Sequence, residues 1–407
     1  MRLLLLLLFI CSSLTARVTP GIDRLVTSDY KQLIAGKRIA LFTTQAAVTA
    51  QLKPSATLLK EYEPIHGYKL VALFAPEHGL DGAKHAGEKV DHSTFMGIPV
   101  YSLHGSHRRP SKEQLQGIDV LVIDIQDLGS RSYTFLTTAS YLIEEAAKQK
   151  IAVVITDRPN PINGLVVDGP RLQPQWQSFL GYLNIPYCHG MTLGELMTLY
   201  NEEAKLGCKV SVVPMQGWNR SMTFAETGLN WIPTSPNIPE ATSPLYYPIT
   251  GILGELQIVS IGIGYTLPFR VVGAPWIDAD TLASKLNAQK LTGIHFQPIH
   301  FKPFHGKFAK EECHGVLLVV TDPKTLKPVT TGYTLIGMLK SMYPQEFSQA
   351  LKLSGERKNT FNRVNGNELV YKALESEPYP AWTLRELAQK EASAFEKVRQ
   401  RFLIREY

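Results

Sequence analysis

The run Ile118-Asp119-Val120-Leu121-Val122-Ile123-Asp124 decides the fold. It is short, rich in β-branched residues and almost continuously apolar, which is typical of a strand buried in a parallel sheet. Residues 133–149 follow it with apolar side chains three and four positions apart, the spacing of an amphipathic helix. A buried strand followed by a helix predicts the repeating unit of an α/β fold.

Four further runs of the same kind surround this one in the first half of the chain. Two more helical patterns separate them, and Thr192 with Glu195 predicts a capping box at the start of the second. We therefore expect a Rossmann-like parallel sheet with helices on both faces. The runs are 38–43, 69–74, 151–156 and 209–213, and the helical patterns are 55–62 and 192–204.

Beyond Pro214 the strand–helix alternation gives way to a segment rich in Trp, Pro and Asn. The rest of the chain predicts a second, smaller α+β domain. We expect a Rossmann-like catalytic domain over residues 20–245 and the C-terminal domain over 246–407. Its expected helices are 278–289, 334–342 and 384–401, and its expected strands are 294–301 and 316–320.

The first sixteen residues have the pattern of a secretory signal peptide. A positive start is followed by an apolar run that is too short to span a bilayer, and then by small polar residues up to Ala16. We expect an exported protein, periplasmic or extracellular, with no membrane span after cleavage. Retention of the segment as an anchor and lipidation at Cys11 are the alternatives. The remaining cysteines predict buried free thiols: Cys188, Cys208 and Cys313.

Composition excludes several classes of function. The 407 residues are 44% hydrophobic, and the net charge of +6 is spread along the chain, so we expect a globular protein that does not bind nucleic acid. No glycine-rich phosphate motif follows any predicted strand, so we expect no cofactor. No metal site is expected, and His295, His300 and His305 are interpreted as solvated or packed histidines.

Polar residues follow each predicted strand at the point where ligands bind in open α/β sheets. Two carboxylates in different environments can hydrolyse a glycosidic bond, although this pattern permits that chemistry without specifying it. Asp124 and Asp157 have a structural alternative, because they could cap the next turn or pair with Arg131 and Arg158. The group comprises Glu77, His78, Asp124, Asp127, Arg131, Tyr133, Asp157, Arg158 and Asn160.

These strand-end motifs resemble the NamZ-type exo-β-N-acetylmuramidase family, from about Gly21 through Trp276 and more weakly to Tyr407. The resemblance implies an exported glycoside hydrolase with its active site between a Rossmann-like domain and a smaller one. It implies release of N-acetylmuramic acid from non-reducing ends of peptidoglycan-derived glycans, in cell-wall turnover or recycling. The matching motifs are Phe74-Ala-Pro-Glu77-His78-Gly79, Ala86-Gly-Glu88, Asp124-Ile-Gln126-Asp127, Asp157-Arg-Pro-Asn160, His189-Gly-Met-Thr192 and Ser235-Pro-Asn237.

The resemblance also assigns roles to particular residues. Glu77 becomes the key catalytic carboxylate, acting as general acid. Asp127, Asp124 or Glu88 provides the second carboxylate or orients water. The lactyl carboxylate of muramic acid needs a cation, which the planar fork of Arg131 or Arg158 suits. The expected sugar contacts, with Asp157 included among the substrate-binding residues, are His78, Tyr133, Asn160, His189 and Asn237.

The chain departs from the family pattern in one loop. One glutamate and two arginines of that pattern are replaced here by Ile261, Ile263 and Leu267, and an asparagine by Thr44. The lost charges favour altered specificity or, as an alternative function, a non-catalytic muropeptide-binding protein. A metal-dependent hydrolase is a third, weaker hypothesis.

Overall fold

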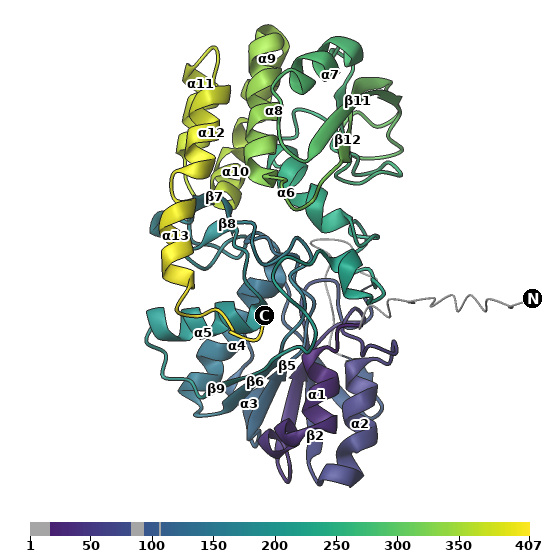
Figure 1. The fold of residues 1–407 in the computed structure, drawn as a ribbon, viewed down its shortest axis with the longest axis vertical. Helices are drawn as coiled ribbons and strands as arrows, with labels where there is room; N and C mark the ends of the chain where they lie inside the picture. Colours follow the sequence, from purple (N-terminus) through teal and green to yellow (C-terminus); the bar gives the residue numbers. More distant parts are fainter. Residues whose placement is uncertain (1–16, 83–92, 106) are drawn as a thin grey trace, which may run out of the picture.

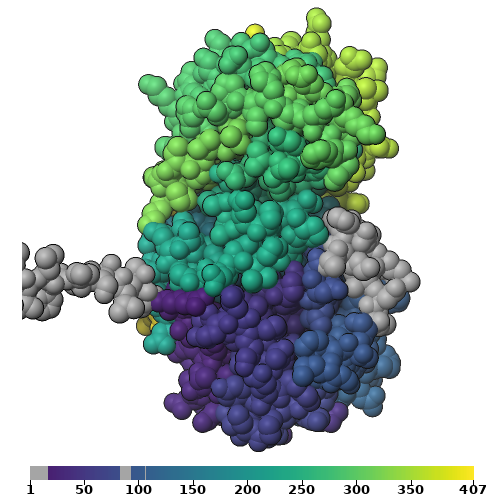
Figure 2. All heavy atoms as spheres, turned by 90° about the vertical axis from the view of Figure 1, so that its right-hand side faces the viewer, coloured from purple at the N-terminus to yellow at the C-terminus, as the bar shows by residue number. Residues whose placement is uncertain are grey.

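The computed structural model describes residues 17–82, 93–105 and 107–407, and these form two lobes (Figure 1). The lower lobe contains most of the first half of the chain, and the upper lobe contains residues from the second half. Figure 2 shows the same two lobes from the side, with residues from the middle of the chain spanning the boundary between them.

A seven-stranded sheet forms the centre of the lower lobe, with β1 in the middle. Every neighbouring pair is parallel except β3 and β4 at the edge. In spatial order the strands are β3 (Ser93–Phe95), β4 (Ile98–Ser102), β2 (Lys69–Ala75), β1 (Arg38–Phe42), β5 (Val120–Ile123), β6 (Ala152–Thr156) and β9 (Val210–Val213).

Helices cover both faces of this sheet because alternate residues of each strand point to opposite sides. Ile39 and Leu41 share a core cluster with residues of α1 (Gly21–Thr27) and α2 (Ser55–His66). Phe42 belongs to the cluster that contains residues of α4 (Thr134–Lys148) and α5 (Leu193–Glu203). The predicted Rossmann-like architecture is therefore confirmed.

The upper lobe combines a small antiparallel sheet with helices, as predicted. In spatial order its strands are β10 (Val271–Ala274), β12 (Cys313–Val320) and β11 (Ile294–Phe301). Its helices are α6 (Ser243–Gly254), α7 (Ala279–Asn287), α8 (Pro328–Met342), α9 (Pro344–Leu353), α10 (Lys358–Asn365), α11 (Leu369–Ser376), α12 (Ala381–Gln389) and α13 (Ala392–Arg399).

The element predictions need correction at several places. The sequence analysis did not anticipate, among others, the strands β3, β4 and β10 or the helices α1, α6, α9, α10 and α11, and it joined α12 and α13 into one helix over residues 384–401. The helix is interrupted around Glu391, whose carboxylate accepts a hydrogen bond from the backbone N–H of Arg171 at 2.7 Å. This contact fixes the junction against β7 (Asp168–Arg171), which pairs with β8 (Pro186–Cys188).

The chain crosses between the lobes more than once. The β7–β8 pair lies beside α8, α12 and α13 although it belongs to the first half of the sequence. In the opposite direction, the segment after α13 returns to the lower lobe, where Tyr407 donates a hydrogen bond to Asp157 (Figure 1). The division between residues 245 and 246 stays a prediction, and the chain segments on its two sides are interleaved.

Further expectations concern membrane-spanning helices, the cysteines and the N-terminal segment. In the ranges that the structure describes, no helix is both long and apolar enough to cross a lipid bilayer. The three cysteines Cys188, Cys208 and Cys313 are buried free thiols, as predicted. The expected signal peptide, Cys11 and Glu88 lie outside the described residues.

Candidate active site

Glu77 lies just after β2, at the carboxyl edge of the sheet. Its Oε2 accepts a hydrogen bond from the Thr134 hydroxyl at 2.8 Å, which positions the carboxylate against the start of α4. His104, which follows β4, places Nε2 3.8 Å from Oε1 of Glu77. Burial lowers the pKa of His104, so its ring is neutral at pH 7. Glu77 therefore lies in a shielded setting with a polar anchor on one oxygen.

The backbone after Glu77 is held in an unusual conformation. His78 has φ of +74° and is buried, with its ring edge-on to Phe135 at 6.5 Å between centroids. Left-handed conformations are rare for residues other than glycine and occur often at functional sites. The strained turn makes the Glu77 segment a strong candidate for function.

Asp127 lies in the loop after β5, opposite His189. One of its oxygens, Oδ2, accepts from the backbone N–H of Gly129 at 2.8 Å and lies 3.6 Å from His189 Nε2. The Met191 N–H donates to His189 Nδ1 at 3.2 Å, so in the neutral ring the proton is on Nε2, facing Asp127. Within the described residues, buried Oδ1 of Asp127 has no hydrogen-bond partner. Asp127 thus retains acceptor capacity for a ligand or water.

Tyr247 connects these carboxylates to the space between the lobes. Its hydroxyl hydrogen-bonds Ser132 at 3.0 Å, and its ring lies edge-on to Tyr133 at 6.2 Å. Burial raises the pKa of Tyr247, and the hydrogen bond with Ser132 opposes this effect. The charges of Glu255, Glu77 and Asp127 raise the pKa further. The field of all three carboxylates therefore reaches this one hydroxyl.

A cavity of about 760 Å³ lies beside Tyr247, between residues of both lobes. Such a volume suits a sugar-sized ligand or larger. Its polar lining includes Ser132, Tyr187 and Asn237, which is a predicted sugar contact. Its apolar lining includes Ile261 and Ile263, two of the three residues that depart from the family pattern. Leu267 instead packs in an apolar cluster around Val271.

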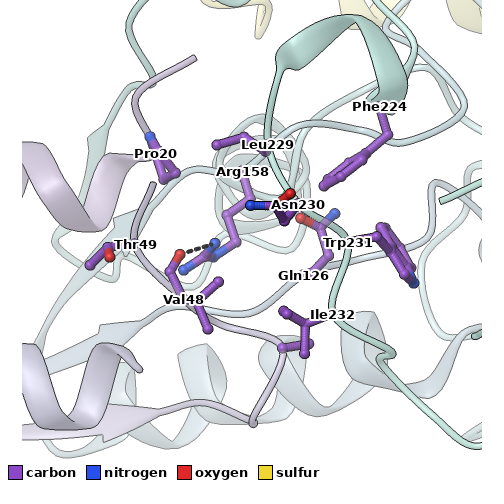
Figure 3. A pocket seen from close by; sticks show the side chains of 11 residues that line it. Pro20, Val48, Thr49, Gln126, Arg158, Phe224, Leu229, Asn230, Trp231 and Ile232 are labelled. Carbon is purple, nitrogen blue, oxygen red and sulfur yellow. Dashed lines mark hydrogen bonds between the residues drawn. The ribbon is translucent and has the colours of Figure 1, made fainter. Parts of the chain in front are cut away.

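Asp124 and Arg158 form a buried ion pair instead of facing this cavity. The Arg158 guanidinium donates to both carboxylate oxygens of Asp124, at 2.7 and 2.8 Å, and the Ser55 hydroxyl donates to one of them. The Nη1 atom of Arg158 donates to the Val48 carbonyl at 2.9 Å (Figure 3). The pocket that Figure 3 shows around Arg158 encloses about 20 Å³, room for about one water. The structural alternative for Asp124 matches this geometry.

Arg131 holds segments from the two halves of the chain together through hydrogen bonds. Its side chain is fully buried, and its two Nη atoms donate to four backbone carbonyls, at 2.6 to 3.2 Å. Burial lowers the pKa of Arg131 to about 10. An anionic ligand would have to displace these carbonyls, so the geometry argues against Arg131 as the receptor for a lactyl carboxylate. The acceptors belong to Pro170, Ile185, Val364 and Asn365.

Asp157 and Asn160 also make internal contacts. The Asp157 carboxylate accepts from the Gly194 N–H at 2.9 Å, at the start of α5, and from the Tyr407 hydroxyl at 2.8 Å. Burial raises the pKa of Asp157 to about 7. Asn160 donates to the Met191 carbonyl at 3.0 Å and accepts from the Ile162 N–H at 3.1 Å. Both residues support the site by fixing its loops.

The cavity has two cations on its upper side. Arg357 donates to the backbone carbonyl of Glu255 at 3.1 Å and contacts its carboxylate at 3.3 Å. Lys307 lies on the connection between β11 and β12, with Nζ 4.8 Å from the centre of the Phe308 ring. Arg131 and Arg158 are used internally, so among the described residues Lys307 and Arg357 are the lysine and arginine that line this cavity.

Several of these residues were missed in the sequence analysis. His104 follows β4, so it would have been found by the strand-end rule had that strand been recognised. Thr134 lies within the predicted helical pattern 133–149, and no role was assigned to it. Tyr247 and Lys307 come from segments with no strand-end signal, and only the approach of the two lobes reveals them. In the described part of the chain, the side chains at the carboxyl edge of the seven-stranded sheet provide no group of three metal-ligand atoms.

Comparison with known proteins identifies relatives along nearly the whole chain. Two family models match: exo-β-N-acetylmuramidase NamZ, N-terminal, over residues 39–242, and exo-β-N-acetylmuramidase NamZ, C-terminal, over residues 245–404. The peptidoglycan β-N-acetylmuramidase NamZ of Bacillus subtilis (strain 168) is 38% identical over 392 residues, covering 95% of this chain and 91% of the relative.

Solved structures agree with this result. A crystal structure of a DUF1343 family protein from Bacteroides fragilis NCTC 9343 superposes with a TM-score of 0.87 at 36% identity, covering 95% of this chain and 99% of that one. A second DUF1343 family protein from the same organism gives a TM-score of 0.73 at 28% identity, covering 95% and 98%.

Proposed function

The chain belongs to the NamZ family of exo-β-N-acetylmuramidases, which are glycoside hydrolases, and from this premise we propose that it releases N-acetylmuramic acid from the non-reducing ends of peptidoglycan fragments. The observation that carries the proposal is the placement of Glu77 and Asp127 at one edge of the sheet, where Glu77 accepts a hydrogen bond from Thr134, two residues after the cavity-lining Ser132. Hydrolysis of a glycosidic bond requires a pair of carboxylates.

Glu77 acts as the general acid in this proposal. It protonates the glycosidic oxygen as the bond to the muramic acid C1 breaks, and water supplies the new hydroxyl at that carbon. The Thr134 hydroxyl holds Oε2, and His104 Nε2 lies 3.8 Å from Oε1, so both oxygens have a fixed position at the edge of the sheet. Asp127 is the second carboxylate, and its unsatisfied Oδ1 accepts a proton from water or stabilises the positive charge that develops on the sugar.

Lys307 is the proposed receptor for the lactyl carboxylate. It lines the cavity, and no described carboxylate lies within ion-pair distance of its Nζ, unlike Arg357, which is held by Glu255. An ammonium on a flexible stem can follow a carboxylate without the fork geometry that arginine provides. This assignment replaces the prediction that Arg131 or Arg158 fills the role.

We also propose that the protein acts outside the cytoplasm, in cell-wall turnover. The support is the charged start, apolar run and small-residue exit within residues 1–16, together with a substrate class that lies in the cell wall. Detection of the mature protein in a periplasmic or culture fraction, starting after Ala16, would test it. Recovery in the cytoplasm with residues 1–16 intact would contradict it.

The activity is tested with the disaccharide MurNAc-GlcNAc and with 4-nitrophenyl β-MurNAc. We expect free MurNAc from both. Glu77→Gln should lower kcat on the disaccharide by roughly 10²- to 10⁴-fold, the usual contribution of general acid–base catalysis. Its loss on the nitrophenyl substrate should be smaller, because nitrophenolate departs without being protonated. The glutamine side chain can still accept from Thr134, so folding should be preserved.

Glu346→Gln is the matched control, since this glutamate is exposed on α9 and makes the same charge change away from the cavity. Equal losses on both substrates would contradict the general-acid role. Absence of turnover by well-folded wild type would reject the hydrolase.

A muropeptide-binding protein without turnover is the second candidate. Ile261 and Ile263 favour it, because they place apolar side chains on the cavity lining where the family pattern has charges. Calorimetry with a muropeptide would then show binding while chromatography shows intact substrate. Absence of both binding and turnover rejects this candidate.

A further inference from the structure

Three metal-ligand side chains meet at the end of the β11–β12 pair. His300 and His314 are direct partners in the antiparallel register, so their side chains share one face of the sheet. Glu312 lies just before the start of β12, and a carboxylate oxygen of its side chain lies near a ring nitrogen of each histidine. Residues 302–312 connect the two strands, so the three side chains close the base of that connection.

The geometry of this cluster is tight. Nδ1 of His300 and Nδ1 of His314 are 2.7 Å apart, and the ring centroids are 4.9 Å apart. One ligand atom from each of His300, Glu312 and His314 lies within 4.8 Å of the others. All three residues are accessible, two of them exposed and His314 partly so. A metal ion can therefore reach the cluster from solvent.

We propose that His300, His314 and Glu312 form a binding site for a divalent transition metal of the zinc type. Two imidazoles and one carboxylate are a ligand set that zinc accepts in tetrahedral sites, with water completing the shell. Two nitrogens on one tetrahedral zinc stand about 3.3 Å apart, so the present pair needs to open by about 0.6 Å. Exposed side chains at the end of a strand pair can make that adjustment by rotation.

The site is placed to control the connection that it closes. Gly306, Lys307 and Phe308, which lie in the 302–312 connection, line the cavity between the lobes. The Phe301–Cys313 pair already joins the ends of this connection, and a metal held by His300, Glu312 and His314 adds a second link there, which restricts its motion further. The bound metal therefore reduces the motion of the segment that contains Lys307.

Calorimetry with zinc chloride on EDTA-treated, dialysed full-length protein tests the site. We expect one zinc per chain with a dissociation constant in the micromolar range or tighter. The double variant His300→Ala, His314→Ala should weaken binding by roughly 10-fold or more. His295→Ala is the matched control, since this histidine is exposed on the other face of β11 and should leave binding unchanged.

Amide hydrogen exchange distinguishes this site from non-specific zinc binding, because only zinc bound at this site should change the exchange rate of residues 302–312. Zinc should slow exchange in residues 302–312 of the wild type and of His295→Ala, and not in the double variant. Circular dichroism of the metal-free proteins shows whether the variants fold alike, and Glu312→Gln supplies a second, milder loss of a ligand. Stoichiometric zinc binding that survives in the double variant, or no binding at 100 µM zinc by well-folded wild type, would overturn the proposal.

Discussion

Removing the Tyr407 hydroxyl should destabilise the fold in a way that depends on pH. In Tyr407→Phe the buried Asp157 carboxylate loses a donor at 2.8 Å, and the Met215 N–H loses an acceptor at 2.9 Å. A buried group left without its partner costs about 1–3 kcal/mol. In a chain of this size, each kcal/mol lost from the free energy of unfolding lowers Tm by about 2–4 °C at most.

The sign of the pH dependence follows from Asp157. Burial raises its pKa to about 7, above the ordinary value of 3.8. Its contribution to stability is therefore fully present below about pH 4 and is lost as the pH rises through 7. The Tyr407 hydroxyl offsets part of this loss, because its hydrogen bond favours the ionised carboxylate. Tyr407→Phe should accordingly cost more at pH 8 than at pH 5.

Urea denaturation at pH 5, 6.5 and 8 measures this difference as a change in the free energy of unfolding. Tyr379→Phe is the control, because that side chain is 72% exposed and should change nothing. A loss for Tyr407→Phe that is equal at all three pH values, or larger at pH 5, would refute the reasoning about Asp157.

Three further substitutions separate structural from catalytic roles. Arg131→Met should lower the free energy of unfolding by at least about 3 kcal/mol, since buried carbonyls from both halves of the chain lose their donor. A free energy of unfolding close to wild type in urea denaturation would contradict this role of Arg131. Asp127→Asn should lower kcat by roughly 10²-fold or more on both the disaccharide and the nitrophenyl substrate, because its role does not depend on the leaving group. Wild-type rates for Asp127→Asn would show that Asp127 takes no part in catalysis. Lys307→Met should raise KM for muramyl substrates about 10-fold with little change in kcat, and an unchanged KM would show that the lactyl carboxylate binds elsewhere.

The sequence predicted those parts of the site that follow from strand ends. Glu77 and Asp127 come directly after buried runs, and the parallel sheet brings such positions to one edge. The β4 strand was missed because it contains Pro99 and is only partly buried, so its pattern is weak. His104 was missed with it.

The direction in which a loop side chain points could not be predicted. In the sequence, Arg131 and Arg158 are equally good candidates for binding the lactyl carboxylate. In the structure, Arg131 donates to the carbonyls of Val364 and Asn365, more than 230 positions away. No local pattern contains that contact. For Ile261 and Ile263 the sequence showed which charges were absent, and the structure added that both side chains line the cavity.

The return of residues 399–407 to the lower lobe affects the order of events during synthesis. Domains of a nascent chain generally fold in sequence, the N-terminal one first. Here Asp157 and Glu195, both buried in the lower lobe, obtain partners from Tyr407 and from the Ile404 N–H at 2.8 Å. A ribosome-bound chain whose first 330 residues have emerged still lacks these partners. The lower lobe therefore completes its packing only after the upper lobe has been made.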